Sequence, residues 1–393
     1  MLKFLLIVSL VFVSSLTLSA QSRVTASFDK DWLFLRSDSQ GVEQPTFDDS
    51  TWRKVDVPHD WSIEGPFDAK NPTGGAGGFL PAGIGWYRKH FTLPATQSAR
   101  RVFIEFDGVM ANSDVWINNF HLGRRPYGYV SFGYDLSDHL NFGKDNVIAV
   151  RADNSGQPAS RWYTGAGIYR HVRLVTIDAV HLATWSAFVT TPRIDKNSAS
   201  IVVSSEIVNQ GSTAQPASLE VDILDPQGKR VGHGASPSAP IGGGQTFDAS
   251  TRFGINNPQL WDIGNGILYK AVVRVRSNGK TLDEQIIPFG IREFHFDPAT
   301  GFWLNGKNFK IKGACLHHDG SAFGAAVPLA VWERRLNELR KLGVNAIRNS
   351  HNPAGDFLDL ADRMGFLVMD ELFDQWTLPK NPYDYHLYFN EWS

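Results

Sequence analysis

The sequence predicts a multidomain protein in which two β-sandwich units precede an α/β unit with parallel strands. From about Arg23 to Gly290, short apolar runs alternate with polar residues and are interrupted by Gly, Asn and Asp, a pattern typical of sandwich strands. After Gly290, short apolar strands are separated by segments in which apolar residues recur at helical spacing, which favours a parallel sheet. The length of 393 residues fits two or three domains of roughly 100–200 residues each.

The composition excludes several classes of protein. Lys and Arg number 38 against 40 Asp and Glu, a formal net charge of −2, so the sequence does not indicate a nucleic-acid binder or a basic membrane-surface protein. A hydrophobic fraction of 42% with 20% charged residues excludes wholesale disorder. The single cysteine, Cys315, allows no intramolecular disulfide and no cysteine-rich zinc site. The 12 tryptophans fit either sandwich cores or platforms for sugar rings.

The first 20 residues have the pattern of a secretory signal. Lys3 supplies a positive charge, Phe4–Val13 is apolar, and the small, polar stretch that follows ends at Ala20, where we expect cleavage. An uncleaved membrane anchor is the alternative, but the apolar core is short for a spanning helix. We therefore expect an exported protein, periplasmic or secreted, that is not attached to a membrane after signal cleavage.

The first unit, up to about Ile177, contains the clearest strand patterns. Val102, Ile104 and Phe106 alternate with polar residues, and the stretches 146–151 and 171–175 show the same period of two. A helical face at a spacing of 3.6 residues is not visible here. These short runs predict the strands of a sandwich.

A second, smaller β unit follows. The composition becomes polar around Thr191–Ser198, which marks a candidate boundary. Apolar residues alternate from Leu219 to Ile223, and Asn278-Gly279 after the stretch 271–275 is a strong hairpin signal. Several short strands in about 110 residues fit an immunoglobulin-like sandwich, although no cysteine pair supports a true immunoglobulin domain.

The last unit alternates strands and helices. Phe309–Leu316 is predicted as a strand, and Pro328 opens a helix that Gly343 ends. A short strand over 344–348, a helix ending at Gly365 and an apolar strand over 366–369 follow. This order indicates a parallel α/β arrangement whose strands are buried on both faces.

Polar and ionisable residues lie at the carboxyl end of each of these strands: His317, His318 and Asp319; Arg348, Ser350 and His351; Asp370 and Glu371. In a (β/α)8 barrel this is the active-site face, and an open doubly-wound sheet binds ligands at the same ends. An arginine there offers a planar donor fork to a carboxylate, either for function or as a structural salt bridge. Adjacent histidines on a strand point to opposite faces, which disfavours a metal site.

The most specific motif is Asn345–Pro353 followed by Asp370-Glu371, and it resembles glycoside hydrolase family 2, which contains β-galactosidases, β-glucuronidases and β-mannosidases. The resemblance covers essentially the whole chain after the signal sequence. Further motifs similar to this family occur in order: Phe47–Trp52, Val57–Trp61, Gly85–Lys89, Gly165–Arg170, Leu260-Trp261, Phe289–Arg292 and Gly301–Lys307. Within the family, Pro58–Pro66 with Gly74–Trp86 looks most like the β-galactosidase type.

The resemblance implies a fold class and domain limits. We expect an all-β jelly-roll sugar-binding domain over 21–178 after the signal peptide at 1–20. An immunoglobulin-like β-sandwich over 179–291 and the first three strands of a (β/α)8 TIM barrel over 292–393, a truncated barrel, follow it.

The resemblance also implies retaining hydrolysis of terminal β-galactosides or related β-glycosides, and thus a role in carbohydrate metabolism. Two glutamates about 5–5.5 Å apart carry out such hydrolysis. His317 and His351 match positions that contact the sugar, Arg348 matches the arginine that orients the nucleophile, and Asp370 and Glu371 match the acidic pair closing the third strand. The alternatives are a β-glucuronidase or β-mannosidase type and a carbohydrate-binding protein without catalysis.

The match to the family stops before the catalytic glutamates. Asn390-Glu391 resembles the acid/base motif, but Glu391 lies only 20 residues after Glu371, without an intervening apolar strand. Only 98 residues follow His295, against roughly 250 in a complete barrel. We therefore expect an amino-terminal fragment, inactive alone, whose acid/base and nucleophile glutamates lie beyond Ser393.

The expected ligand is a carbohydrate substrate, with no nucleic acid, no cofactor and no metal. Some members of the family carry a Glu-x-His metal site soon after the acidic pair, where this chain has Asp374–Thr377. The jelly-roll loop that places an acid near the pocket in some members is Ser160–Tyr163 here. A homo-oligomer is compatible with the sequence.

Overall fold

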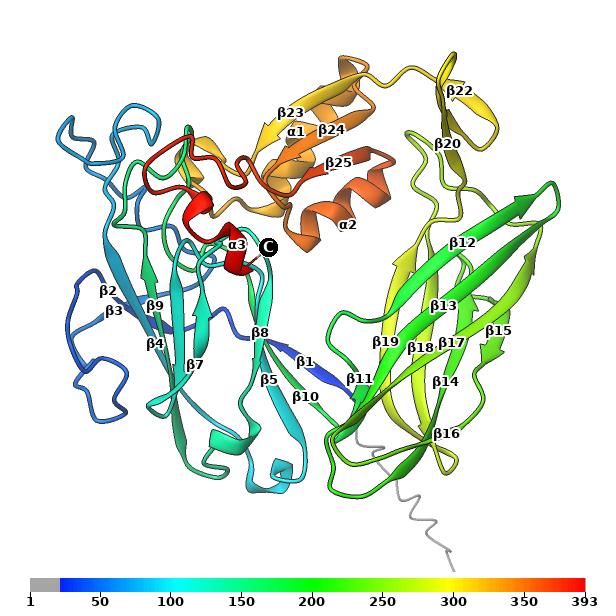
Figure 1. The fold of residues 1–393 in the computed structure, drawn as a ribbon, viewed down its shortest axis with the longest axis horizontal. Coiled ribbons are helices and arrows are strands. Elements are labelled where there is room, and N and C mark those ends of the chain that lie inside the picture. The colour runs from blue at the N-terminus through cyan, green and yellow to red at the C-terminus, as the bar shows by residue number, and fades with distance from the viewer. Residues whose placement is uncertain (1–21, 393) are drawn as a thin grey trace, which may run out of the picture.

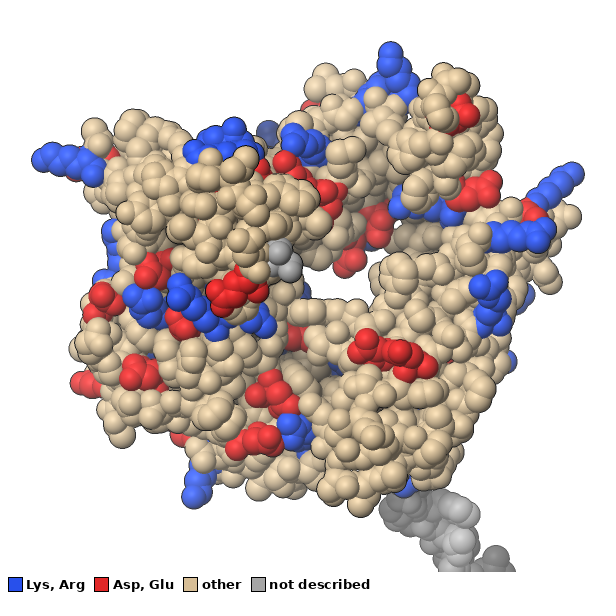
Figure 2. Space-filling model, viewed as in Figure 1, with Lys and Arg blue, Asp and Glu red and all other residues tan. Residues whose placement is uncertain are grey.

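The computed structural model describes residues 22–392, so the predicted signal sequence at Met1–Ala20 lies outside the described residues. Figure 1 shows three units: two β-sandwiches lie side by side, and an α/β unit lies across the top and contacts both. Within the described part of the chain, no helix combines the length and the hydrophobicity needed to cross a bilayer. On the face seen in Figure 2, acidic and basic side chains are interspersed without a broad patch of one sign.

The first sandwich, residues 22–177, packs a four-stranded sheet against a six-stranded sheet. Their orders are β1-β10-β5-β8 and β3-β2-β4-β9-β6-β7. The predicted alternation is confirmed, because Val102, Ile104 and Phe106 are all fully buried in the core between the sheets. The elements are β1 (Val24–Ser27), β2 (Trp32–Leu35), β3 (Arg53–Val55), β4 (Ile84–Thr92), η1 (Ala95–Gln97), β5 (Arg101–Phe106), β6 (Ser113–Ile117), β7 (Phe120–Arg125), β8 (Phe132–Asp135), η2 (Ser137–His139), β9 (Asp145–Asp153) and β10 (Val172–Ile177).

The second sandwich, residues 180–289, also has two antiparallel sheets, and the buried side chains from Leu219 to Ile223 lie in the core between them. Asn278-Gly279 joins β18 to β19 as predicted. The candidate boundary at Thr191–Ser198 is wrong, because Asp195 pairs with Ser198 across a hairpin, and the polarity is that of a turn. The strands are β11 (Val180–Leu182), β12 (Phe188–Asp195), β13 (Ser198–Asn209), β14 (Gln215–Leu224), β15 (Arg230–Ala235), β16 (Ala239–Ile241), β17 (Gln245–Asn256), β18 (Tyr269–Ser277) and β19 (Lys280–Phe289).

The α/β unit, residues 294–392, begins with an antiparallel sheet and continues with a parallel one. The stretch Phe309–Leu316 is two strands rather than one, because the chain leaves the antiparallel sheet after Phe309 and enters the parallel sheet at Gly313. The elements are β20 (Phe294–Asp297), β21 (Gly301–Leu304), β22 (Lys307–Phe309), β23 (Gly313–His317), η3 (Ser321–Phe323), α1 (Leu329–Lys341), β24 (Ala346–Ser350), α2 (Gly355–Met364), β25 (Leu367–Glu371), η4 (Tyr385–Leu387) and α3 (Phe389–Trp392).

The parallel sheet has the order β23-β24-β25, which confirms the predicted arrangement of strands and helices. Helices α1 and α2 cover one face, where Leu336, Ile347 and Phe357 are buried together. The expectation that both faces are buried is not met within residues 22–392, since Arg348 and Met369 on the opposite face are exposed. Several of the residues that the sequence predicts as a site lie on this open face.

Candidate functional site

The carboxyl ends of the three parallel strands place the predicted side chains side by side. His317 pairs in register with Ser350, and Ser350 with Glu371. Because side chains alternate along a strand, His317, Arg348 and Glu371 share the open face of the sheet. Arg348 donates from Nη2 to Glu371 Oε1 at 2.7 Å. The structure thus brings three of the five predicted site residues together on one surface.

His351 lies directly after β24 and turns back toward the same group. Its Nε2 lies 3.0 Å from Ser350 Oγ, and its Nδ1 lies 3.2 Å from the backbone oxygen of Glu371. Only 1% of its surface is exposed, and this burial lowers the pKa of His351 below the usual value for histidine. The ring is therefore neutral at pH 7 and offers one donor and one acceptor nitrogen.

Asp370 is separated from the other predicted residues. It pairs in register with Asn349, so it belongs to the face of the sheet that carries α1 and α2. Burial raises the pKa of Asp370, and the positive charge of Arg170 opposes that rise. The two members of the acidic pair therefore face different surroundings, and Glu371 is the one beside Arg348.

The first sandwich supplies an aromatic wall that sequence reasoning did not assign. The centre of the Trp162 ring lies 5.3 Å from that of His317 and 4.9 Å from that of His351. Trp162 Nε1 donates to the hydroxyl of Tyr129 at 3.0 Å, which fixes the ring. The sequence marks the stretch Ser160–Tyr163 as a loop near the pocket. It does not reveal the contacts of Trp162, because these join residues more than 150 positions apart in the chain.

A cavity of about 110 Å³ opens between the two units beside these rings. It is lined by Tyr129, Trp162 and His351 and, from the segment after β25, by Asp374 and Tyr385 among others. Arg161 and Asp374 join the two sides of the cavity through an ion pair of 2.7 Å. Its lining of aromatic rings with a few polar groups is of the kind found in small-molecule sites.

One cluster has the donor atoms that a metal ion needs. Single ligand atoms of His351, Glu371 and Asp374 all lie within 4.8 Å of one another. Both carboxylates are already paired, Glu371 with Arg348 and Asp374 with Arg161 and Lys380. The cluster as built is an ion-pair network in which each carboxylate already faces a cationic side chain.

His317 and the following His318 point in opposite directions, as expected for neighbours on a strand. His317 is exposed, whereas His318 is buried against Tyr129 and Tyr169 and donates from Nε2 to the backbone oxygen of Thr164 at 2.9 Å. Burial lowers the pKa of His318 to about 3. This histidine is therefore a neutral structural link between the α/β unit and the first sandwich.

We expect His318 to make the fold sensitive to acid. The unfolded chain binds a proton at this residue near pH 6.5 and the folded chain only near pH 3, so its contribution to stability is complete above about pH 6.5 and declines as the pH falls toward 3. Between pH 6.5 and 5 this costs about 2 kcal/mol of unfolding free energy. Urea unfolding at several pH values measures it.

His318→Gln keeps a donor for Thr164 and removes the titrating group, so this part of the acid sensitivity should disappear. The matched control is His121→Gln, because the His121 side chain is 47% exposed. An equal pH dependence in the wild type and His318→Gln would contradict the assignment.

Glu391 lies on a helical turn rather than at a strand end. It is exposed within α3, and the short helix η4 precedes it. Among residues 372–392, the structure places no strand before Glu391. Its position thus differs from that of Glu371, which ends a strand of the parallel sheet.

Three family models match consecutive parts of the chain. The model for "Glycosyl hydrolases family 2, sugar binding domain" matches residues 29–178, and that for "Glycosyl hydrolases family 2" matches residues 180–292. The model for "Glycosyl hydrolases family 2, TIM barrel domain" matches residues 299–376. The expected fold class, a sugar-binding domain, an immunoglobulin-like sandwich and part of a TIM barrel, is therefore confirmed.

Individual proteins show the same likeness. The chain is 44% identical over 94% of its length to the β-galactosidase BoGH2A of Bacteroides ovatus, and 38% identical over 98% to a putative β-glucuronidase of Formosa agariphila. A solved structure of a glycosyl hydrolase family 2 member from Bacteroides cellulosilyticus superimposes with a TM-score of 0.90 at 40% identity, over 93% of this chain. The chain spans 44%, 36% and 48% of these proteins, respectively, so less than half of each.

Proposed function

Because the chain belongs to glycosyl hydrolase family 2, we propose that the protein takes part in the retaining hydrolysis of terminal β-glycosides, with β-galactosides as the preferred class. The relatives that match over nearly all of this chain carry the names of β-galactosidases and β-glucuronidases, and the higher identity to a β-galactosidase supports the choice of sugar. The exported location proposed from Met1–Ala20 fits an enzyme that acts on carbohydrates outside the cytoplasm.

The observation that carries the proposal is the group at the strand ends. Arg348 holds Glu371 at 2.7 Å beside the neutral ring of His351, and Trp162 of the sugar-binding domain faces both His317 and His351. A sugar needs hydroxyl partners on one side and an apolar wall on the other, and this group offers both.

We assign binding and orientation to the residues of this chain. His317 presents its ring nitrogens to sugar hydroxyls, and Arg348 holds the carboxylate of Glu371 with its planar donors. His351, whose ring nitrogens are engaged by Ser350 and the backbone of Glu371, contributes its ring beside Trp162. We propose that the two catalytic glutamates follow Ser393 in the sequence, so the 393-residue chain alone binds sugar without hydrolysing it. A fourth strand ending in Asn-Glu is expected in the gene after Ser393.

A protein that binds carbohydrate without catalysis is the second candidate. The Arg348–Glu371 pair favours it in one respect, because a carboxylate tied to a guanidinium at 2.7 Å is well placed to accept hydroxyl hydrogen bonds without reacting. The two candidates differ in the result expected for a longer product of the same gene: the hydrolase should cleave a β-glycoside, and the binding protein should not.

The test compares binding and turnover in the same preparation. The chain is titrated with a chromogenic β-galactoside, β-glucuronide and β-mannoside, and binding and release of the chromophore are measured. We expect the strongest binding for the galactoside and no release of the chromophore. Arg348→Ala should weaken binding roughly 10–100-fold, because it removes the charge-assisted hydrogen bond that holds the Glu371 carboxylate at the site, and such a bond contributes about 1.5–3 kcal/mol.

Glu391→Gln is the matched control, since Glu391 is exposed on α3 and should change neither measurement. Turnover by the chain that Glu391→Gln abolishes would overturn the placement of the catalytic glutamates. Absence of binding to all three glycosides would overturn the proposed function. Binding without turnover in a longer product of the gene would favour the second candidate.

A further inference from the structure

The carboxylate of Asp60 lies buried at the junction of the first sandwich and the α/β unit. Only 3% of the residue is exposed. Oδ1 accepts from the backbone N–H of Ser62 at 3.1 Å and of Ala166 at 2.9 Å, while Oδ2 accepts from the Tyr163 hydroxyl at 2.6 Å and the Ala325 N–H at 2.8 Å. Four donors from three separate segments therefore converge on one side chain.

Two glycines permit this close approach, one from each unit. A β-carbon at Gly165 would lie 2.8 Å from Asp60 Oδ2 and 2.6 Å from the Ala325 β-carbon, and one at Gly324 would overlap the same oxygen. Both glycines have positive φ, +74° and +57°, which side-chain-bearing residues rarely adopt. The backbone of both units is thus shaped around Asp60.

The two segments that Asp60 joins also carry Trp162 and His318. The rim segment, residues 160–166, carries Trp162, and its Thr164 oxygen accepts from His318. The docking loop, residues 318–325, begins with His318 and ends with Ala325, so it follows His317 directly along the chain. The position of Trp162 against His317 therefore depends on how these two segments are held.

We infer that Asp60 is a positioning residue for the sugar site, which holds the rim segment against the docking loop and so sets the distance between Trp162 and the histidines at the strand ends. The inference rests on the proposed function, because it treats that group as the sugar site. Asp60 does not touch the cavity itself and acts through Tyr163 and Ala325.

This role depends on both oxygens of Asp60 accepting hydrogen bonds. Each oxygen of Asp60 serves two donors, so an amide in its place has to present its NH2 group to one of the two pairs. Asp60→Asn therefore loses at least one backbone hydrogen bond while keeping the size of the side chain. Tyr163→Phe is a milder change that removes only the hydroxyl and leaves the three backbone donors in place.

The test measures amide hydrogen exchange and glycoside binding on the full chain. With Asp60→Asn we expect exchange at the Ala325 amide or in the rim segment to become at least 10-fold faster, and binding of a β-galactoside to weaken about 10-fold. With Tyr163→Phe we expect faster exchange in the rim segment, weaker binding, and an unchanged urea midpoint. Asp49→Asn is the control, because Asp49 pairs with Arg88 and His90 within the first sandwich, and it should leave binding and the docking loop unchanged.

The outcomes separate this inference from the proposed function. Unchanged exchange in both segments with Asp60→Asn would overturn the inference even if the wild type binds sugar. Faster exchange with unchanged affinity would show a purely structural contact and overturn the positioning role. If the wild type binds no glycoside, the proposed function falls and the positioning role falls with it. If Asp49→Asn, at equal loss of stability, weakens binding as much as Asp60→Asn, the effect is general and the inference is wrong.

Discussion

Replacing Trp261 with alanine should lower the unfolding free energy of the α/β unit by about 3–5 kcal/mol, the usual cost of removing a large buried aromatic side chain. Trp261 is 1% exposed and packs with Phe302 and Leu304 at the junction with the second sandwich. Its Nε1 donates to the backbone oxygen of Asp362 in α2 at 2.8 Å, and the guanidinium of Arg292 lies 4.6 Å from the ring centre.

The effect should concentrate where the two units meet. Trp261 links the loop between β17 and β18 of the second sandwich to α2, next to the backbone hydrogen bond from Gly264 to Gly365, so its loss exposes α2 and the hairpin of β20 and β21 first. Hydrogen exchange resolves this, because a multidomain chain need not unfold in one step. We expect faster exchange in α2 and β21 and little change in the first sandwich.

Trp185→Ala is the matched control for Trp261→Ala. Trp185 is 57% exposed, and its replacement should change stability by less than about 0.5 kcal/mol. Trp261→Phe keeps an aromatic ring but loses the Nε1 hydrogen bond, so its effect should lie between the two. Equal unfolding midpoints for the two alanine variants would contradict the role of Trp261 as a junction residue.

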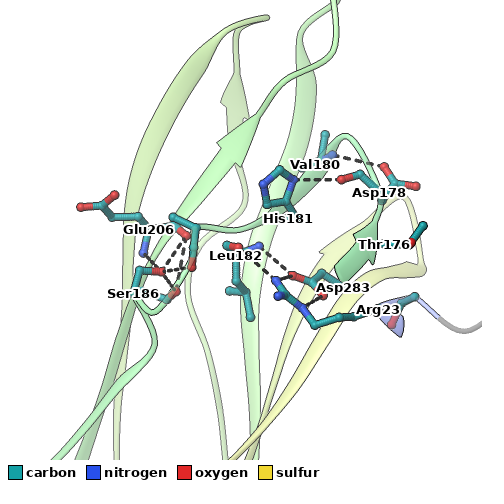
Figure 3. Close-up of polar contacts among 12 residues, drawn as sticks. Arg23, Thr176, Asp178, Val180, His181, Leu182, Ser186, Glu206 and Asp283 are labelled. Carbon is teal, nitrogen blue, oxygen red and sulfur yellow. Dashed lines mark hydrogen bonds and ion pairs between the residues drawn. The ribbon is translucent and has the colours of Figure 1, made fainter. Parts of the chain in front are cut away.

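Replacing Asp283 with leucine should lower the unfolding free energy by about 3–5 kcal/mol, because it leaves a largely buried guanidinium without its carboxylate partner. Asp283 is fully buried, and Arg23 donates to both of its oxygens, from Nε at 2.9 Å and from Nη2 at 2.7 Å. Asp283 Oδ2 also accepts from the backbone N–H of Leu182 at 2.9 Å. Figure 3 shows Arg23, which directly precedes β1, against Asp283 and Leu182 of the second sandwich.

A double-mutant cycle tests this pair. Asp283→Leu and Arg23→Met are made singly and together, and urea unfolding gives the coupling between them. We expect the double variant to be more stable than Asp283→Leu alone, since it leaves no unpaired charge. The exposed pair Arg193–Asp195, with side chains 76% and 50% exposed, is the control, and Asp195→Ala should change stability by about 0–1 kcal/mol. Additive single effects at Arg23 and Asp283 would contradict the expected coupling.

The sequence predicted local structure well wherever neighbours along the chain decide it. The alternation of Val102, Ile104 and Phe106, the turn at Asn278-Gly279 and the helix between Pro328 and Gly343 all lie where expected. Polar composition misled at Thr191–Ser198, because a hairpin turn and a domain boundary have the same composition. The sequence does not reveal the break after Phe309, because Phe309-Lys310-Ile311-Lys312 alternates apolar and polar residues with the period of a single strand.

The candidate site was predicted in part. The order of strands placed His317, Arg348 and Glu371 at one edge, since parallel strands end together. Asp370 faces the other side of the sheet from Glu371, because adjacent residues on a strand point to opposite faces, and its role at the site stays a prediction. Trp162 meets His317 and His351, and Asp60 meets Ala325, only through packing of the first sandwich against the α/β unit, and Asp60 lies 265 residues from Ala325 in the chain.

By itself the sequence determined the order of the units, the strands and helices within them, and the family to which the chain belongs, because these follow from periodicity, turn residues and motifs read over short distances. Tertiary structure alone decided which side chains meet. Trp162 against His317 and His351, Asp60 against Ala325 and Arg23 against Asp283 are contacts between segments more than 150 residues apart. Their geometry depends on how the units pack, which no local pattern in the chain records.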